Sequence, residues 1–268
     1  SMRKVLGIEY KGTRYFGWQK QKKFITVQGE LEKALKKFLS KNKVETFGSG
    51  RTDTGVHASS QVVHFDTDIK RPKRSWINGL NSLLPDDISV HSVFDTHDEF
   101  HSRFSAIDRS YRYIIYNGPF RKSLFADYFC WYPNSLLDEK KMQLCDKYLL
   151  GKKNFSSFRS SGCQSHSSTR KIKKFKVFRK DDYIYIDIKA DSFLYNMVRN
   201  IVGSLCLVGE GKKSRYWFND LVKKENRIYG GKKFPASGLH LVEIRYPKSF
   251  RVASVSYTHL RAHETVRN

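Results

Sequence analysis

Long apolar runs are absent from this 268-residue sequence, and so is any cysteine spacing typical of a metal site or a disulfide framework. A membrane-spanning helix needs about 20 consecutive apolar residues, and no run approaches that length. No apolar signal-peptide segment follows the first residues either, so we expect no membrane partner. The four cysteines are far apart and form no CxxC pair. This pattern is typical of reduced thiols in a cytoplasmic protein and predicts no bound metal.

Acidic residues are also scarce relative to basic ones. The chain has 26 Asp and Glu against 50 Lys and Arg, a net charge of +24 and a pI near 9.9. Clustered Lys and Arg displace the counterions condensed on nucleic-acid phosphates, so a nucleic-acid partner is favoured. An acidic membrane surface is the rival, but no basic amphipathic helix with a clean apolar face stands out. A generally basic protein with no polyanionic partner is the remaining alternative.

The chain has enough apolar residues to fold, and their spacing predicts a repeated order of elements. Hydrophobic residues make up 39% of the sequence, with 19 Phe and 15 Tyr, which argues against a disordered chain. In the first half the spacing predicts strands at 5–10, 44–47, 61–66 and 88–95, with helices at 27–39 (capped by Thr26) and 76–84. In the second half it predicts strands at 110–117, 169–178, 183–190 and 240–246, with helices at 137–150 and 194–208 and a short one at 217–224.

Both halves therefore follow the order β-α-β-β-α-β, the split βαβ arrangement of ferredoxin-like and RNA-recognition folds. We predict an α+β fold of two pseudo-repeated subdomains, 1–105 and 106–248, which form a mixed, mainly antiparallel sheet with a central cleft. Residues 249–268 have no apolar period and follow a natural end at Tyr246-Pro247. We interpret them as a non-native or disordered tail outside the fold.

One glycine-rich stretch, from Gly48 to Ala58 (GSGRTDTGVHA), has the composition of a functional loop. Glycines allow positive φ and a close approach of a ligand to the backbone, and the stretch carries one cation, Arg51, and one carboxylate, Asp53. An adjacent guanidinium keeps a carboxylate ionised, as a nucleophile or base requires. The alternative is a solvated hairpin loop. The sequence does not favour a phosphate-binding loop, because Val56-His57 stands where Lys-Ser/Thr is required.

Other well-known catalytic patterns are missing. The sequence has no HExxH, no GxSxG and no paired glutamates, which argues against a metalloprotease or an α/β-hydrolase. His57 and His64 are imaginable as metal ligands, but a lone histidine in a strand or loop is more often structural. We therefore expect no metal site.

Four blocks of the sequence together resemble the TruA family of tRNA pseudouridine synthases. The first is the stretch from Gly50 to Ala58, which is similar to the family's catalytic motif. The others are FHSRFSA at 100–106 followed by YRY at 111–113, DSFLYNMVRNIVG at 191–203, and PASGLHL at 235–241. They occur in the family's order across almost the whole chain before the tail. Two positions differ, since Thr54 and Ser102 stand where the family usually has Ala.

The resemblance implies an isomerase that converts uridine to pseudouridine on the 3′ side of the tRNA anticodon stem-loop. It implies no cofactor and no metal, a cytoplasmic location, and a homodimer in which one tRNA contacts both subunits. The family's catalytic aspartate corresponds to Asp53 and its active-site tyrosine to Tyr111. Arg199, in the Asn-Met-Val-Arg helix, corresponds to the arginine that pairs with the aspartate. Arg51 corresponds to the arginine that helps take the target base out of the stack.

The residue types suit this chemistry but leave its course open. A uridine within a stem must be flipped out of the stack, and an arginine can fill or guide the vacated space. Asp53 has three possible roles: to attack C1′, to add to C6 of uracil, or to remove the C2′ proton. Tyr111 can stack on the base and assist loss of the C5 proton, although an aromatic residue in a strand is often only part of the core.

Two other classes of protein compete with this interpretation. One is a non-catalytic RNA-binding protein of RNA-recognition-motif-like architecture, but the Lys/Arg-Gly-Phe/Tyr sequence of that motif is absent. The other is a nucleoside hydrolase or glycosylase that uses Asp53, which would release free base.

Overall fold

The computed structural model describes residues 2–252, which divide into two compact units. Unit 1 comprises residues 2–109 and 240–252, and unit 2 comprises residues 110–239. The sequence predicts a boundary after residue 105 and a last strand that belongs to the second subdomain. The structure divides the chain differently, because that last strand, β10 (Leu239–Arg245), pairs in parallel with a strand of unit 1 through His240 and Leu241.

Unit 1 is built on the strand order β4-β1-β3-β10, with the short β2 (Phe47–Gly48) also paired to β3. Strand β1 (Met2–Tyr10) runs antiparallel to both β3 (His57–Thr67) and β4 (Ile88–Thr96). Only β10 is parallel to its neighbour β3 within this unit. The order along the chain up to β4 is β-α-β-β-α-β, as predicted.

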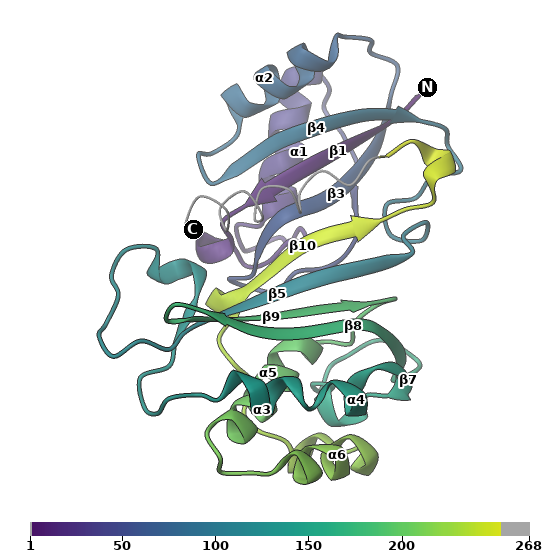
Figure 1. Ribbon diagram of the computed structural model, residues 1–268. Coiled ribbons are helices and arrows are strands. Elements are labelled where there is room, and N and C mark those ends of the chain that lie inside the picture. Colours follow the sequence, from purple (N-terminus) through teal and green to yellow (C-terminus); the bar gives the residue numbers. More distant parts are fainter. Residues whose placement is uncertain (1, 253–268) are drawn as a thin grey trace. The chain divides into compact units, whose positions relative to one another are not determined.

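Two helices, α1 (Val27–Leu39) and α2 (Lys73–Leu83), cover one face of this sheet (Figure 1). Helix α1 begins as predicted, since the Thr26 side chain accepts a hydrogen bond from the Gly29 N–H. The rings of Phe38 on α1 and Phe65 on β3 both contact the Trp76 ring on α2, at centroid distances of 5.0 and 5.9 Å. Trp76 is completely buried, so this cluster forms the centre of the core of unit 1.

Unit 2 has the strand order β5-β9-β8-β7, with the short β6 (Cys130–Trp131) paired in parallel to β5. Its strands are β5 (Asp108–Tyr116, whose first two residues belong to unit 1), β7 (Gly151–Asn154), β8 (Thr169–Lys180) and β9 (Tyr183–Ala190). Strand β8 is antiparallel to both β7 and β9. The helices are α3 (Glu139–Gln143), α4 (Asp146–Leu149), α5 (Met197–Gly209) and α6 (Arg215–Lys224), gathered on one side of these strands (Figure 1). The predicted α+β class and mainly antiparallel pairing are thus confirmed within each unit, while the cleft stays a prediction.

The helix predicted at 137–150 is wrong as a single element. It is two short helices, because the chain tightens at Leu144 and Cys145, where ψ is −13° and −4°. Met142, Cys145 and Leu149 are nevertheless all buried. The apolar spacing therefore reports correctly which side chains face the core, although the helical hydrogen bonding is interrupted between them.

The C-terminal tail expected from residue 249 lies mostly outside the described residues. The part that is described continues unit 1: Lys248–Phe250 form a short 3-10 turn. The ring of Phe250 packs against the Phe100 and His97 rings at 5.3 and 5.1 Å, and its carbonyl accepts a hydrogen bond from Thr96 Oγ1.

Between residues 2 and 252, none of the helices has the length and apolar character required to cross a bilayer.

Candidate active site

The loop that carries Asp53 is fixed by hydrogen bonds on both sides of that residue. The Thr52 hydroxyl lies 2.6 Å from the Tyr10 hydroxyl at the end of β1, and its carbonyl accepts a hydrogen bond from the Trp18 N–H at 3.0 Å. The Asp53 carbonyl accepts a hydrogen bond from the Val56 N–H at 3.0 Å, which closes a turn. Thr52, Val56 and Trp18 are buried. The backbone of Asp53 is thus held in one position while its side chain stays half-buried.

Glycines explain how the chain fits around this loop. Of the three glycines in the stretch 48–58, Gly55 alone has a positive φ, at +82°, in the turn that follows Asp53. A fourth, Gly17, has φ +81°, and a Cβ there would lie 2.7 Å from the Thr52 carbonyl oxygen. A side chain at position 17 would therefore push against the backbone beside Asp53.

The start of the loop is held by a buried glutamine on β3. Gln61 Nε2 donates to the Gly50 carbonyl at 2.9 Å, and its Oε1 accepts a hydrogen bond from the Ser49 hydroxyl. Gln61 is completely buried, so these bonds are shielded from water. Arg51 follows directly and is exposed. The guanidinium predicted to act on the RNA is thus accessible, on a backbone that is anchored at Gly50 and Thr52.

In unit 2, Tyr111 lies on β5 between residues that fix the strand. Arg112 is buried and forms a two-pronged ion pair with Asp187 on β9, at 2.7 and 2.8 Å. Tyr113 is completely buried, and its hydroxyl donates to the Pro235 carbonyl at 2.7 Å. Tyr111 is half-buried and meets the Phe193 ring edge to face, at a centroid distance of 4.9 Å. The Tyr111 ring is therefore presented on a strand whose next two residues are anchored by their side chains.

Arg199 lies in the first turn of α5 and is held by its own unit. Its Nε donates to the Phe234 carbonyl at 2.7 Å, and Nη1 to Asn196 Oδ1 at 3.3 Å. The Phe234 N–H in turn donates to the Arg199 carbonyl at 3.2 Å. The guanidinium is thus oriented by two oxygen acceptors, although α5 is otherwise strongly apolar.

The two histidines considered as metal ligands have structural partners. His57 Nδ1 accepts a hydrogen bond from the Gly12 N–H at 2.9 Å. His64 Nδ1 accepts one from the Ser102 N–H at 3.0 Å, and the Ser102 hydroxyl donates to the Phe47 carbonyl at 2.8 Å. Burial, followed by the nearby charge of Arg3, lowers the pKa of His64 to about 4. Among the described residues, no group of three or more His, Cys, Asp or Glu side chains could hold a metal ion.

The predicted site residues fall into two pairs. Arg51 and Asp53 share one loop of unit 1, whereas Tyr111 and Arg199 belong to unit 2. Sequence reasoning missed the residues that hold the loop, namely Tyr10, Trp18 and Gln61. Gln61 was the one detectable signal, because it is a polar residue at the start of an otherwise apolar strand pattern. Ser102, one of the departures from the family pattern, has a local role in binding the carbonyl of Phe47.

The sequence matches known proteins along most of its length. Residues 7–105 and 146–247 match the family model described as tRNA pseudouridine synthase. The tRNA pseudouridine synthase A of Colwellia psychrerythraea is 47% identical over 251 residues, covering 94% of this chain and 96% of that protein. The tRNA pseudouridine synthase A of Actinobacillus succinogenes is 46% identical, covering 94% of this chain and 94% of that protein. That of Buchnera aphidicola is also 46% identical, covering 95% of this chain and 95% of that protein.

Solved structures give a much weaker likeness. A chain of a Cbf5-Nop10-Gar1 complex aligns with a TM-score of 0.38 and 11% identity, over 76% of this chain and 45% of that chain. A likeness of that size indicates nothing about function. The family model and the close relatives, by contrast, confirm the resemblance inferred from the four sequence blocks. The chain belongs to the tRNA pseudouridine synthase family and is therefore an isomerase.

Proposed function

We propose that this enzyme converts uridine to pseudouridine in the anticodon stem-loop of tRNA, with Asp53 as the essential catalytic group. The observation that carries the proposal is the loop of unit 1, in which the backbone of Asp53 is fixed on both sides while Arg51 is exposed. A carboxylate on a fixed backbone beside an exposed cation suits a reaction in which one group acts on a nucleotide that another has drawn out of the stack.

The reaction requires no reagent beyond the RNA itself. The bond between uracil N1 and C1′ breaks, and a bond between C5 and C1′ forms. The C5 proton is lost and N1 gains a proton, so the product is an isomer of the substrate. Asp53 acts at C1′, at C6 or on the C2′ proton, and all three routes need the carboxylate to be ionised.

Tyr111 and Arg199 are proposed to complete the site. Tyr111 stacks on the uracil and contributes to loss of the C5 proton, and Arg199 pairs with Asp53. The contact of the Tyr111 ring with Phe193 and the hydrogen bond from Arg199 to the Phe234 carbonyl support these roles, since a catalytic group benefits from contacts that fix its orientation.

Tritium release from tRNA labelled at uridine C5 tests the proposal. Wild-type enzyme is expected to release tritium, and Asp53→Asn is expected to release none while still binding tRNA. Asp98→Asn, an exposed change elsewhere in unit 1, is the matched control and should behave as wild type. Appreciable turnover by Asp53→Asn would refute the assigned role. Release of free uracil would indicate a glycosylase, and binding without any release would indicate a non-catalytic RNA-binding protein.

The proposal includes a homodimer in the cytoplasm, where tRNA is available. An exposed apolar segment in unit 2 supports self-association: Phe120, Leu124 and Phe125 are 77%, 74% and 65% exposed. Exposed apolar groups that lie close together are typical of interaction surfaces.

A further inference from the structure

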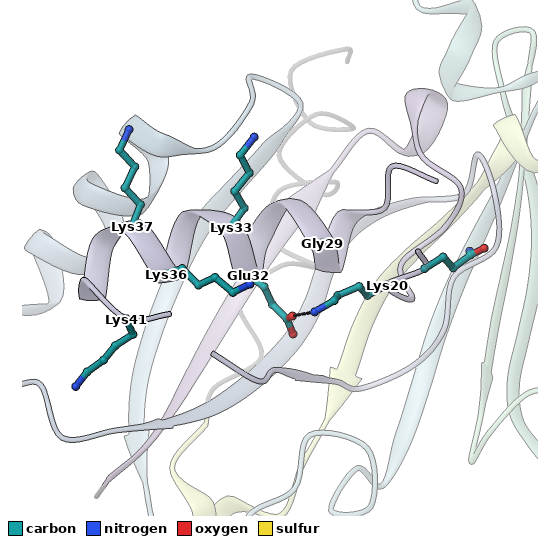
Figure 2. A pocket seen from close by; sticks show the side chains of 8 residues that line it. Lys20, Gly29, Glu32, Lys33, Lys36, Lys37 and Lys41 are labelled. Carbon is teal, nitrogen blue, oxygen red and sulfur yellow. Dashed lines mark hydrogen bonds and ion pairs between the residues drawn. The ribbon is translucent and has the colours of Figure 1, made fainter. Parts of the chain in front are cut away.

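A second basic surface lies on helix α1, separate from the loop of Asp53. It is a groove of about 520 Å³ between α1 and the segment at residues 20–21, and its outer rim carries five lysines. These are Lys20, Lys33, Lys36, Lys37 and Lys41 (Figure 2). The remaining residues that line it are Gln21, Gly29 and Glu32.

The single carboxylate of the groove does not neutralise this rim. Glu32 is only 4% exposed. Its Oε1 accepts a hydrogen bond from Lys20 Nζ at 2.8 Å, and its Oε2 accepts hydrogen bonds from the Thr46 N–H and hydroxyl at 3.0 and 2.7 Å. Both oxygens are therefore engaged, and one of them already balances Lys20.

The four other lysines lack such a partner. Within residues 2–252, none of Lys33, Lys36, Lys37 and Lys41 forms an ion pair. Lys33 and Lys37 are four residues apart on α1, so their charges repel along one side of the helix, whereas Lys41 follows the end of the helix. The negative end of the helix dipole stabilises the charges of Lys36 and Lys37 in the last turn of α1. It does not stabilise the charge of Lys33, which lies in the middle of the helix.

Hydrogen bonds connect the segment that borders the groove with the loop of Asp53. The Lys20 N–H donates to Gln28 Oε1 at 2.8 Å, and the Gln28 N–H donates to the Trp18 carbonyl at 3.0 Å. The Trp18 N–H is bonded to Thr52, the residue before Asp53. An RNA strand placed at Asp53 thus has a fixed, positively charged surface available in the same unit.

We propose that this α1 groove binds the sugar-phosphate backbone of the tRNA, away from the nucleotide that reacts at Asp53. The inference rests on the proposed function for the identity of the RNA. Its chemistry rests on four lysines without an ion-pair partner in the described part of the chain, spread over α1 and the turn that follows it, which suit several phosphates better than a single small anion. Contacts of this kind fix the position of the RNA and carry no base specificity.

A charge-neutral triple variant, Lys33→Gln/Lys36→Gln/Lys37→Gln, tests the groove directly. Glutamine has nearly the same helix propensity as lysine, so α1 should remain folded, as circular dichroism would verify. We expect binding to unmodified tRNA, measured by fluorescence anisotropy, to weaken about tenfold, and the slope of log Kd against log salt to fall by about 2.

The matched control is Lys140→Gln/Lys141→Gln/Lys152→Gln, which removes the same charge from exposed lysines of unit 2. It should leave both the affinity and the salt slope close to wild type. Equal losses in the two triple variants would reduce the effect to overall charge and overturn the proposal. So would unchanged binding in the α1 variant, or a selective loss of binding to phosphatidylserine vesicles instead of tRNA. This assay measures tRNA binding and is independent of tritium release. If the wild type releases tritium and the α1 variant binds tRNA as tightly as wild type, only the role of the α1 groove is refuted and the proposed function stands.

Discussion

At the scale of single residues, the site depends on Asp53 being fixed and on Tyr111 presenting its ring. Tyr111 touches Phe193 through its ring, so removal of the hydroxyl should preserve that packing. If Tyr111 takes part in loss of the C5 proton, Tyr111→Phe should lower kcat by about 100-fold, the usual scale for one acid-base group, with little change in tRNA affinity. Single-turnover kinetics measure this, and wild-type turnover would confine Tyr111 to stacking.

His64 predicts a pH dependence of stability in unit 1. Its folded-state pKa is about 4, below the ordinary value of 6.5, chiefly because burial disfavours the charged ring. The unfolded chain therefore binds the proton more tightly, so the contribution of His64 to stability is present above pH 6.5 and is lost as the pH falls towards 4. Protonation would also place a proton on Nδ1 against the Ser102 N–H.

Urea unfolding at a series of pH values between 7 and 4 would measure this effect. We expect His64→Asn to be less stable than wild type at pH 7 and to lose less stability on acidification. The control, His166→Asn, changes an exposed histidine of unit 2 and should retain the wild-type dependence. Parallel pH profiles for all three proteins would contradict the role assigned to His64.

At the scale of elements, the loop of Asp53 should act as a rigid support. Thr52→Val keeps the side-chain shape but removes the hydroxyl that lies 2.6 Å from the buried Tyr10 hydroxyl, and the loss of this one hydrogen bond should cost about 0.5–1.5 kcal/mol of stability. We expect kcat to fall as well, because the backbone of Asp53 is less firmly held. Thr54→Val, on the same loop but exposed, is the control. Steady-state kinetics and thermal unfolding measure both effects, and equal behaviour of the two variants would rule out the supporting role.

Elements whose signals are local were predictable from the sequence. Helix α1 was correct in its bounds and in its Thr26 cap, and β9 was correct at both ends, because apolar period and capping chemistry are local. The break between α3 and α4 was not predictable, since buried Met142, Cys145 and Leu149 keep a helical spacing across it. The place of β10 beside β3 was missed for a different reason: strand pairing joins residues about 180 positions apart, which no local pattern reports.

In the candidate site, too, the features with a local sequence signal were predictable and the long-range contacts were not. Asp53 and Arg51 were identified because a glycine-rich loop with a charged pair is visible in the sequence. The hydrogen bonds from Tyr10 and Trp18 that hold it join residues far apart in the chain and became visible only in the structure.

At the scale of the whole molecule, self-association is the first property to test. Phe120→Ser/Phe125→Ser removes two exposed rings that we expect to be covered in a dimer. Sedimentation equilibrium should show a dimer for wild type and a shift towards monomer for this variant. Ile228→Ser changes an equally exposed apolar residue elsewhere in unit 2 and should remain dimeric. A monomeric wild type would contradict the homodimer.

The net charge of +24 gives the second whole-molecule expectation, that tRNA binding weakens steeply with salt. Charge alone would act on any RNA, however, and the central claim concerns one region of one kind of RNA.

The most direct test of that claim is to map pseudouridine at single-nucleotide resolution in unmodified tRNA after incubation with the enzyme. The account predicts new pseudouridine on the 3′ side of the anticodon stem-loop, and none after incubation with Asp53→Asn. Modification confined to another part of the tRNA, or the absence of modification in every tRNA tested, would contradict it.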